Sequence, residues 1–345
     1  MKKILIIGSG AAGLAAGRFL VGQGHDVTLF DKGFRLGGRL ATRNIHGFRF
    51  DHATALLSRD GLTDDLPDAD FATWPSDLPL DLPLDLPSSK PEAVNTGVGV
   101  PAMRSLAEAW GAGLTIRQGV TVEKISQTPD GYIVDISADI KPSAEQAKPY
   151  CGPYDGVIVT APAPQAAVLL ADIPELAALV ELAEKAVYDP QWALLVGYDI
   201  APENNALENL PPCYVSPHPD ISLITHETAK PGRSGKTAFV VHAGADWSRA
   251  HLDLSKPEAA ARLLPLFQEI TGNLPALSSP SYLAGHLWRY SRVQQIAGAA
   301  EKDVLAAHQA IAIAGDWVIS PDVKGARTSG RLAAENLHRY LIKEA

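Results

Sequence analysis

The first residues that could do chemistry are three glycines near the N-terminus, Gly8, Gly10 and Gly13, in the spacing G-x-G-x-x-G. They follow Lys3 to Ile7, an apolar run typical of a strand buried on both faces, and the small residues after them predict a helix up to Gly22. In this context the first glycine permits a tight turn, the second leaves room for a pyrophosphate, and the third lets the helix pack closely on the sheet. The pattern predicts a dinucleotide site with its phosphates at the helix N-terminus.

An acidic residue completes the pattern. Residues 26–30 predict a second strand that ends at Asp31, at the distance of about 20 residues from the glycines where a carboxylate suits ribose hydroxyls. A chance glycine run and a signal peptide are the alternatives, since MKK precedes the apolar residues. The glycines and Arg18 interrupt the apolar stretch, and no convincing small-residue cleavage site follows. We therefore expect a strand, a turn and a helix that stay in the protein.

A second glycine-rich loop follows at residues 36–43, LGGRLATR. Gly37 and Gly38 let the backbone turn close to a ligand. Arg39 and Arg43 supply guanidinium groups whose geometry suits phosphate. The alternative is a pair of arginines in a solvated loop. The paired glycine just after a dinucleotide motif favours phosphate contact.

Composition excludes several classes. The 345 residues suffice for two domains, or for one large domain with an insertion, and no apolar run reaches the ~18–20 residues that span a bilayer. The formal net charge of −9 argues against nucleic-acid binding. The two cysteines, Cys151 and Cys213, form no C-x-x-C pair, which argues against disulfides and zinc and is typical of the cytoplasm. We expect no metal site and no membrane partner.

The acidic residues gather in one segment. Residues 60–89 hold eight aspartates and no lysine or arginine, and they include the repeat LPLDLPLDLP. Proline at every fourth position forbids a helix and favours extended chain. We expect an exposed linker or lid edge, with a functional acidic patch as the alternative.

The remaining elements must position these loops. We expect a hairpin over 119–137 with its turn at 128–131, a buried strand over 155–160 and one helix over 165–185. A mostly β module of about 100 residues follows, with one helix that opens on the capping box Ser255 and Glu258. Residues 310–314 then predict a strand that runs into Gly315 and Asp316, before a long C-terminal helix. We expect this last part to rejoin the first sheet.

The predicted fold is therefore α/β, a Rossmann-like nucleotide-binding domain with an inserted, mostly antiparallel β substrate domain. Residues 1–70, 96–165 and 290–345 would form the nucleotide-binding domain. Residues 71–95 would form an acidic, proline-rich linker or lid, and residues 166–289 the substrate domain.

Seven motifs indicate the protein class more narrowly. GSGAAG, DKGFRLGGRLATR and the C-terminal AGDW…GARTSGRLAAENL together resemble the flavin amine oxidase superfamily. VGVPAM, VIVTAPAPQAA and KPGR…VVHAGADWSRAHL, with HLWRYSRV, resemble the renalase family, especially its bacterial members. The resemblance covers most of the chain except about residues 53–95. It implies that the nucleotide-binding domain is a Rossmann-like FAD-binding domain of the glutathione-reductase/p-hydroxybenzoate-hydroxylase type. It also implies non-covalent FAD, and residues 270–345 contain no cysteine that could form a thioether to the ring.

The far C-terminal motifs favour FAD over NAD on physical grounds too. FAD is the longer cofactor, and its ribityl chain and isoalloxazine need further contacts. A carboxylate at Asp316, after Gly315, suits a ribityl hydroxyl, with a turn or helix cap as the alternative. Gly325 and Ala326 open a helix and could direct N–H groups at the flavin N1/C2=O. The cofactor-binding residues implied by motif and resemblance are Gly8, Gly10, Ala11, Ala12, Gly13, Asp31, Lys32, Gly38, Arg39, Thr42, Arg43, Val122, Thr160, Gly315, Asp316, Gly325 and Ala326.

The renalase resemblance implies an oxidase that takes a hydride from misreduced dihydro-NAD(P) isomers to flavin N5 and passes electrons to O2, giving H2O2. Such a donor becomes an aromatic pyridinium without losing a proton, so no side-chain base is required. His242, at a predicted strand end, is the candidate polar residue facing the substrate, or else a hydrogen-bonded strand histidine. Trp288 is a candidate aromatic wall, or else a core residue. Lys230 and Arg233 are expected in an exposed loop, with a substrate phosphate as the alternative.

One stretch departs from the renalase pattern. Renalase-like chains have roughly D-x-G-A-Q-Y-F after the second glycine motif, where this chain has DHATALLSRD at residues 51–60. The leucines at 56 and 57 make a polar cage for an amine less evident. The alternatives are an amine oxidase and a flavin-binding protein without turnover, with a plain NAD-dependent dehydrogenase as the least favoured.

Overall fold

The structure is a computed structural model, and it describes residues 1–59, 70–74, 96–138, 150–201, 207, 209–216, 218–300, 304, 306 and 309–343. Within these residues the chain forms two compact units. Unit 1 comprises residues 1–38, 107–187 and 293–345, and unit 2 comprises residues 39–106 and 188–292. Residues 39–59 and 96–106 thus pack with unit 2. The division into functional domains drawn from the sequence stays a prediction, and the LPLDLPLDLP repeat lies outside the described residues.

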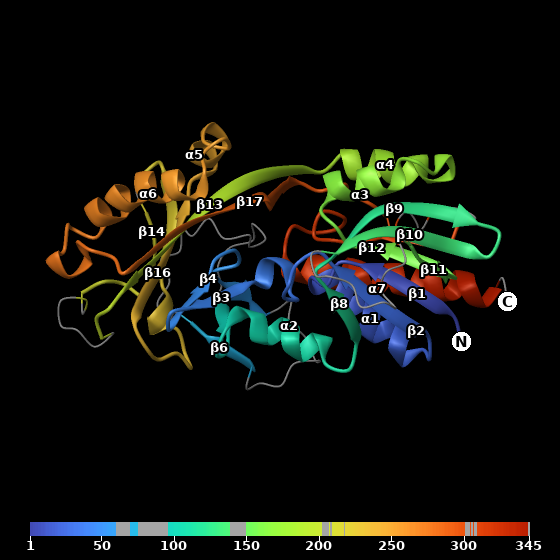
Figure 1. The fold of residues 1–345 in the computed structure, drawn as a ribbon, viewed down its shortest axis with the longest axis horizontal. Helices are drawn as coiled ribbons and strands as arrows, with labels where there is room; N and C mark the ends of the chain where they lie inside the picture. The colour runs from blue at the N-terminus through green and yellow to red at the C-terminus, as the bar shows by residue number, and fades with distance from the viewer. Residues whose placement is uncertain are drawn as a thin grey trace. The chain divides into compact units, whose positions relative to one another are not determined.

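A five-stranded parallel sheet forms the centre of unit 1 (Figure 1), with the strand order β18-β12-β1-β2-β8. The strands are β18 (Ile311–Ile313), β12 (Gly156–Val159), β1 (Lys3–Ile7), β2 (Asp26–Asp31) and β8 (Thr115–Gln118). The central residues of β18, β12 and β1 are fully buried, as expected for apolar runs in a parallel sheet, whereas the edge strand β8 is partly exposed. The pairing of β18 with β12 confirms that the last part of the chain rejoins the first sheet.

Two long helices, α1 (Ala11–Gly22) and α7 (Val323–Lys343), lie side by side in unit 1 (Figure 1). They approach so closely that a Cβ on Gly330 would lie 2.1 Å from the backbone oxygen of Ala12. Farther along, the rings of Phe19 and His338 meet edge to face with centroids 6.2 Å apart. The helices therefore run in the same direction, and α7 covers the helix that follows the glycine motif.

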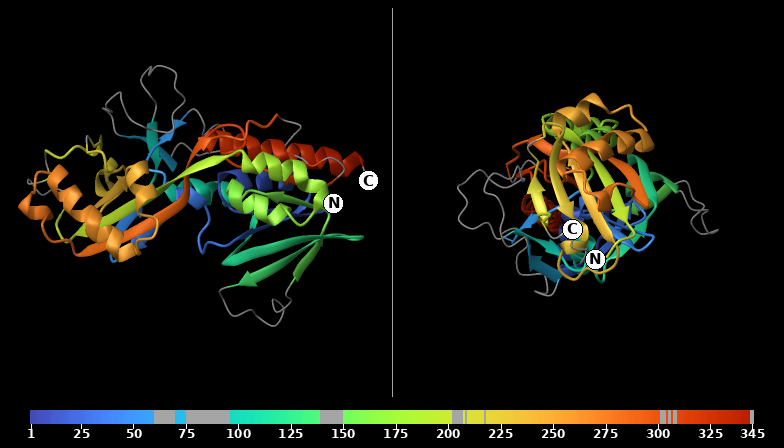
Figure 2. Two further views of the ribbon diagram at one scale, coloured as in Figure 1. Left: turned by 90° about the horizontal axis from the view of Figure 1, so that it is seen from above. Right: turned by 90° about the vertical axis from the view of Figure 1, so that its left-hand side faces the viewer.

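A smaller antiparallel sheet and two short helices complete unit 1. The sheet has the order β11-β10-β9, and Figure 2 shows it as a layer distinct from the parallel sheet. The elements are β9 (Val120–Thr128), β10 (Gly131–Ala138), β11 (Tyr150–Tyr154), α3 (Ala163–Leu170) and α4 (Ala177–Glu184). The predicted hairpin is confirmed. The single helix expected over 165–185 is wrong, because Pro174 opens a short 3-10 turn between α3 and α4.

Unit 2 contains a five-stranded antiparallel sheet with the order β14-β15-β16-β13-β17. Its strands are β14 (Cys213–Val215), β15 (Ile221–His226), β16 (Thr237–Ala243), β13 (Val187–Tyr198) and β17 (Tyr282–Gln295). This sheet confirms the mostly antiparallel β module that the sequence predicts.

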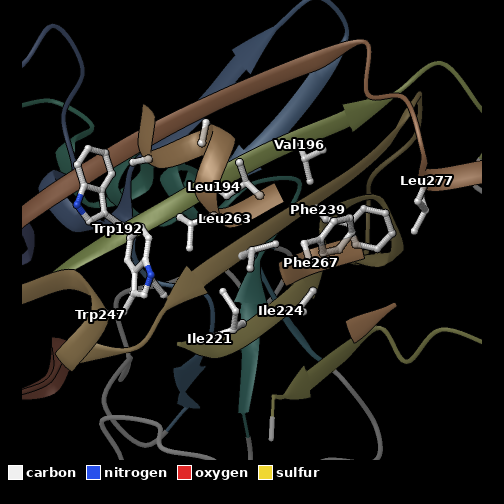
Figure 3. Close-up of a cluster of buried hydrophobic side chains, with 14 of the residues drawn as sticks. Trp192, Leu194, Val196, Ile221, Ile224, Phe239, Trp247, Leu263, Phe267 and Leu277 are labelled. Carbon is white, nitrogen blue, oxygen red and sulfur yellow. The ribbon is translucent and has the colours of Figure 1, made fainter. Parts of the chain in front are cut away.

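Helix α6 (Lys256–Ile270) covers one face of this sheet. Figure 3 shows the apolar core beneath it, in which Leu263 and Phe267 of the helix meet Leu194 and Phe239 of the strands. The predicted capping box is present, with Ser255 accepting from the Glu258 N–H and Glu258 accepting from the Ser255 N–H. Helix α5 (Ala245–Ala250) precedes it.

The opposite face of the sheet carries the alternate side chains of β13 and β16. Ala193, Leu195 and Val240 on this face pack with Phe48 and Phe50 of a two-stranded hairpin. The hairpin consists of β3 (Thr42–Ile45) and β4 (Phe48–Asp51). The remaining elements of this part of the chain are β5 (Leu57–Ser58), β6 (Phe71–Thr73), β7 (Thr96–Gly99) and α2 (Met103–Gly111). In the described residues, no helix is long and apolar enough to cross a membrane.

Candidate functional site

Three glycines of unit 1, Gly8, Gly10 and Gly13, form a tight turn that we call the glycine cradle. Gly8 has a φ of 109°, which favours glycine, and a Cβ on Gly13 would lie 2.0 Å from the Gly8 backbone oxygen. A Cβ on Gly10 would meet nothing within 4 Å. Two of the three glycines are thus required by the fold itself. Gly10 is not, so its lack of a side chain leaves open space for a ligand.

The cradle leads into the N-terminus of α1, where helix geometry leaves backbone donors without partners in the helix. Gly10 is the N-cap and has no side chain to accept them. The first helical hydrogen bond that closes on it runs from Leu14 N to Gly10 O over 3.0 Å. The N–H groups of Ala11 and Ala12 therefore suit a phosphate better than any group of the helix itself.

The second glycine loop lies against the cradle within unit 1. Gly37 N donates to Ser9 O over 2.9 Å, and a Cβ on Gly38 would lie 3.5 Å from the Gly10 Cα. Gly37 and Gly38 both have positive φ angles, of 106° and 54°. Two glycine loops that are separate in the sequence thus line one place on the protein.

Asp31 links the two loops through its carboxylate. Its Oδ2 accepts from Ser9 N at 2.6 Å and from Ser9 Oγ at 2.7 Å, and its Oδ1 accepts from Gly33 N at 2.7 Å. A carboxylate offers about four acceptor sites, so Asp31 retains capacity for a ribose hydroxyl. Its position at the end of β2 is the one the sequence predicts.

Three further predicted residues lie in unit 1. Thr160 Oγ1 donates to Ile7 O over 2.9 Å and lies against the cradle, 2.5 Å from where a Gly8 Cβ would stand. Lys32 is exposed and donates to Gln165 Oε1 over 3.2 Å. Val122 is buried on β9. Their roles toward a cofactor stay predictions.

The segment from Gly315 to Trp317 follows β18 and is held by α7. The Ser329 hydroxyl accepts from Gly315 N at 2.9 Å and donates to Gly315 O at 2.8 Å, while Trp317 Nε1 donates to Ala161 O over 3.1 Å. Asp316 is buried between these anchored neighbours. The loop therefore holds a carboxylate in a fixed place at the end of a parallel strand, where α/β proteins bind ligands.

The sequence predicts that the N–H groups of Gly325 and Ala326 at the start of α7 face the flavin, and the structure uses them differently. Gly325 N donates to Asp322 Oδ1 over 2.6 Å, and Ala326 N donates to Asp322 O over 2.9 Å. These two N–H groups are used by the helix cap, so the first-turn donors that suit a ligand are those of Val323 and Lys324. Gly325 is needed for another reason, since its Cβ would lie 2.1 Å from Ser320 O.

The other predicted phosphate and cofactor contacts belong to unit 2. Arg39 Nη1 donates to Ser291 O over 2.8 Å, and Arg43 Nη1 donates to Tyr282 Oη over 3.5 Å. The Thr42 hydroxyl donates to Asp51 Oδ1 over 2.6 Å. Each of these side chains thus has a partner within its own unit.

Four buried charges form an ionic cluster in unit 2, namely Asp51, Glu227, Lys230 and Arg233, whose side chains are 0–2% exposed. Lys230 Nζ lies 3.1 Å from Asp51 Oδ2 and 2.6 Å from Glu227 Oε1, and Arg233 pairs with both carboxylates. Burial alone would raise the pKa of Asp51, but Lys230 and Arg233 hold it well below its usual range. The expectation of an exposed loop for Lys230 and Arg233 is wrong, because the carboxylates draw both side chains inward.

Four rings gather beside the ionic cluster, on the face of the antiparallel sheet opposite α6. We call His52, His242, His286 and Trp288 the histidine cluster. The ring centroids of His52 and His286 lie 4.5 Å apart, and those of His52 and Trp288 lie 5.4 Å apart with their planes at 21°. Trp288 Nε1 donates to His52 O over 2.9 Å, and His242 also hydrogen-bonds to the His52 backbone. The backbone of His52 therefore anchors both candidates that the sequence predicted.

Burial keeps the imidazoles of this cluster neutral. Desolvation, with smaller effects of nearby cations, lowers the pKa of His242 and of His286 to about 4, and it lowers the pKa of His52 well below its usual range. The buried atoms His52 Nδ1, His242 Nε2 and His286 Nδ1 have no hydrogen-bond partner in the described part of the chain. Buried polar atoms are rarely left in this way, so these three point to a ligand or a water.

Sequence reasoning missed His52 and His286. His52 lies in the DHATALLSRD stretch, where the leucines at 56 and 57 suggested that polar residues had been lost. The histidine directly after Asp51 was the feature that could have indicated a polar site there. His286 opens the HLWRYSRV motif two residues before Trp288, so the alternation of a strand places both on one face. No group of three or more metal-ligating side chains occurs among the described residues.

Comparisons with known proteins now identify the family. The model of the flavin containing amine oxidoreductases matches residues 90–338, and the model of the NAD(P)-binding Rossmann-like domains matches residues 6–63. The chain belongs to the flavin-containing amine oxidoreductase family. The fold is thus the mixed α/β fold predicted, with a Rossmann-like domain and antiparallel sheets in the second part.

Individual proteins are similar to this chain in part of its sequence or in fold. A 1-hydroxycarotenoid 3,4-desaturase from Flavobacterium sp. (strain P99-3) is 44% identical over 66 residues, which are 19% of this chain and 14% of that protein. The solved structure of cyclohexylamine oxidase from Brevibacterium oxydans IH-35A has a TM-score of 0.69 at 12% identity and covers 99% of both chains. A triple mutant of putrescine oxidase has a TM-score of 0.67 at 14% identity and covers 100% of this chain and 99% of that one. These two structures show a shared fold.

The residues of unit 1 fit the FAD that the family uses. The open space at Gly10, the first-turn donors of α1 and the spare acceptor capacity of Asp31 match a pyrophosphate and a ribose. The anchored, buried Asp316 matches a further hydroxyl. These residues thus provide a place for the flavin that this family contains.

Proposed function

We propose that this protein is an FAD-dependent oxidase of the renalase type, whose substrates are dihydronicotinamide dinucleotides reduced at the wrong ring position. The observation that carries the proposal is the histidine cluster, a group of flat rings whose imidazoles are held neutral by burial. A neutral, flat heterocycle suits these rings, because they offer it aromatic faces and uncharged polar edges.

The proposed reaction requires no proton transfer by a side chain. Bound FAD supplies a hydride acceptor at N5 and a route for electrons to O2, which yields H2O2. A dihydropyridine that loses a hydride becomes an aromatic cation and keeps its protons, so no general base is needed. Imidazoles with a pKa of about 4 are weak bases at neutral pH. The work left to His52, His242 and Trp288 is to orient the ring and exclude water.

We further propose that the cofactor is held without a covalent bond, by the glycine cradle, Asp31, Asp316 and the first turn of α7. Cys151 and Cys213 form no disulfide with each other, which supports a reducing cytoplasm as the location. Acid precipitation of the protein should release all of the yellow colour into the supernatant. Colour that stays with the precipitate would mean a covalent link.

The test is an anaerobic titration of the purified protein with dihydro-NAD(P) isomers made by borohydride reduction. We expect the flavin absorbance to bleach with one equivalent of isomer and to recover when O2 is admitted. Ordinary NADH and NADPH serve as matched controls, because they differ from the isomers only in the position of the hydride. Flavin that responds to no isomer would contradict the renalase-type reaction and leave the cofactor assignment intact.

An amine substrate is the second candidate, since neutral imidazoles beside an indole also suit an uncharged amine. Amines belong in the same titration. Bleaching by amines and not by the isomers would assign the protein to amine oxidation. Bound flavin that neither class reduces would indicate a flavin-binding protein without turnover.

A further inference from the structure

Besides its flat rings, the histidine cluster has buried nitrogen atoms that a ligand could pair with. Three of its nitrogen atoms, His52 Nδ1, His242 Nε2 and His286 Nδ1, are buried and without a hydrogen-bond partner among the described residues. The side chains of His52 and His242 are themselves almost fully buried, at 5% and 2% exposure. Each such atom lacks a bond that water gave it in the unfolded chain, which costs about 1–3 kcal/mol. A ligand that pairs with all three would remove this cost.

The tautomer of His242 follows from its other nitrogen. The ring hydrogen-bonds to the His52 backbone in a way that favours the protonated ring, so the partner is the carbonyl oxygen and the ring donates to it. Because Nε2 has no partner, the donor is Nδ1, and a neutral imidazole carries one proton only. His242 Nε2 therefore offers a lone pair and requires a donor from the ligand.

The other two nitrogens can act as donors. In both rings Nδ1 is a buried nitrogen without a hydrogen-bond partner among the described residues, so it can carry the ring proton and donate it to a ligand. The two rings lie with centroids 4.5 Å apart at 60° to each other. A single acceptor atom between them could accept from either ring or from both.

The charges around the cluster do not favour an anion. The groups that act on its rings are the cations Arg43, Lys230, Lys256 and Arg292 and the anion Asp51. Lys230 is paired with two carboxylates, Arg43 donates to Tyr282, and Lys256 is exposed. The lone pair of His242 would also repel a carboxylate. The complementary group is neutral and combines one acceptor with one N–H donor.

We propose that His52, His286 and His242 form a carboxamide-binding subsite, in which the first two donate to the amide oxygen and the third accepts from the amide nitrogen. The inference rests on the proposed function, where the carboxamide is the ring substituent of a dihydronicotinamide. It adds specificity-determining residues to that reaction, two of which, His52 and His286, stand outside the candidates found from sequence.

Simple aromatic probes test the subsite without the dinucleotide. Benzamide has the oxygen and the N–H, acetophenone has the oxygen only, and benzoate carries a charge. Calorimetric titration of the FAD-loaded protein should show benzamide binding at least about tenfold more tightly than either of the others, the effect of about one well-made hydrogen bond. Equal affinities, tighter binding of benzoate, or no binding of any probe would overturn the subsite. If no probe binds, the three nitrogens are hydrogen-bonded to water and not to a substrate.

Ring-preserving variants assign the roles. His52→Phe and His286→Phe should weaken benzamide and acetophenone by a similar factor, because both probes lose a donor to their oxygen. His242→Phe should remove the preference for benzamide over acetophenone. His226→Phe is the matched control, since His226 is also buried, stacked on Phe239 and without a partner at Nε2 in the described residues, but lies outside the cluster. It should leave both affinities unchanged.

Failure of the subsite and failure of the proposed function give different results. If the dihydro isomers bleach the flavin but the probes bind equally, the oxidase stands and the subsite is wrong. If the probes show the expected order but no isomer bleaches the flavin, the subsite stands for a different amide substrate. An effect of His226→Phe as large as that of His242→Phe would show that general destabilisation, and no subsite, explains the losses.

Discussion

Single residues in the glycine cradle separate the needs of the fold from those of the cofactor. Gly13 lies so close to the Gly8 backbone that no side chain fits, whereas Gly10 has open space around it. A chain that needed Gly10 only for packing would show a close contact there. The absence of a side chain at Gly10 therefore has its reason in a ligand.

Three alanine variants test this distinction. Gly10→Ala should fold with unchanged thermal stability but weaken FAD by at least about tenfold, because the methyl group occupies the place of the pyrophosphate. Gly13→Ala should lose both stability and FAD, since its Cβ would lie 2.0 Å from the Gly8 oxygen. Gly22→Ala, at the other end of α1 and with open space around it, is the control. The apoprotein melting temperature and the FAD Kd measure the two effects, and wild-type FAD affinity in Gly10→Ala would contradict the account.

The ionic cluster provides a second prediction for single residues. Asp51→Asn leaves Lys230 and Arg233 buried with one carboxylate in place of two, and such losses cost about 3–5 kcal/mol in the free energy of unfolding. Asp199→Asn is the matched control, because its ion pair with Lys236 is about half exposed and should contribute little to stability. Urea unfolding measures both. A loss for Asp51→Asn no larger than that of the control would show that the cluster is not a structural anchor.

At the scale of elements, several regular strands and helices of both units were predictable from local pattern. The apolar run before Gly8, the capping box at Ser255 and the small strand before Gly315 each fix a boundary through short-range physics. Pro174 was also visible, yet the alanine- and leucine-rich context on both sides hid the break between α3 and α4. Of the long-range contacts, the return of β18 to the first sheet was predicted, whereas the packing of one helix on another was not.

The pairing of α1 with α7 is such a long-range contact, and it rests on a residue without a side chain. Gly330→Ala should destabilise the protein by about 1–3 kcal/mol, because its Cβ would stand 2.1 Å from the Ala12 backbone oxygen and push the helices apart. Arg331→Ala, on the exposed side of α7, should change stability by less than about 0.5 kcal/mol. Thermal melts compare them. A neutral Gly330→Ala would mean that the two helices do not pack as described.

The histidine cluster and the ionic cluster could not be predicted from the sequence alone. His52, His242 and His286 come from three separate segments, and each alone is an ordinary strand or loop histidine. Lys230 and Arg233 look solvated because their partner Asp51 is far away in the chain. Spacing predicts contacts within one turn or one strand, whereas these clusters arise from the order of strands in a sheet.

For the whole molecule, the buried histidines predict how stability depends on pH. His226, His242 and His286 have pKa values lowered to about 4 by burial, so the unfolded chain binds more protons than the folded one below the ordinary histidine pKa of about 6.5. Stability is therefore complete above about pH 6.5 and falls as the pH drops toward 4, by about 1.4 kcal/mol per pH unit for each histidine. Urea unfolding between these pH values measures the slope, and His226→Phe should reduce it by one histidine. A stability that is flat over this range would contradict the burial of these rings.

The central claim is that an uncharged ring gives up a hydride without help from a base. The measurement that tests it most directly is the limiting rate of anaerobic flavin reduction by a dihydronicotinamide isomer, followed by stopped flow between about pH 6 and about pH 9. We predict a rate that stays constant over this range, because no proton leaves the substrate and the imidazoles of the cluster remain neutral throughout. A rate that rises with pH, as removal of a proton from an amine or by a side-chain base requires, would contradict the account.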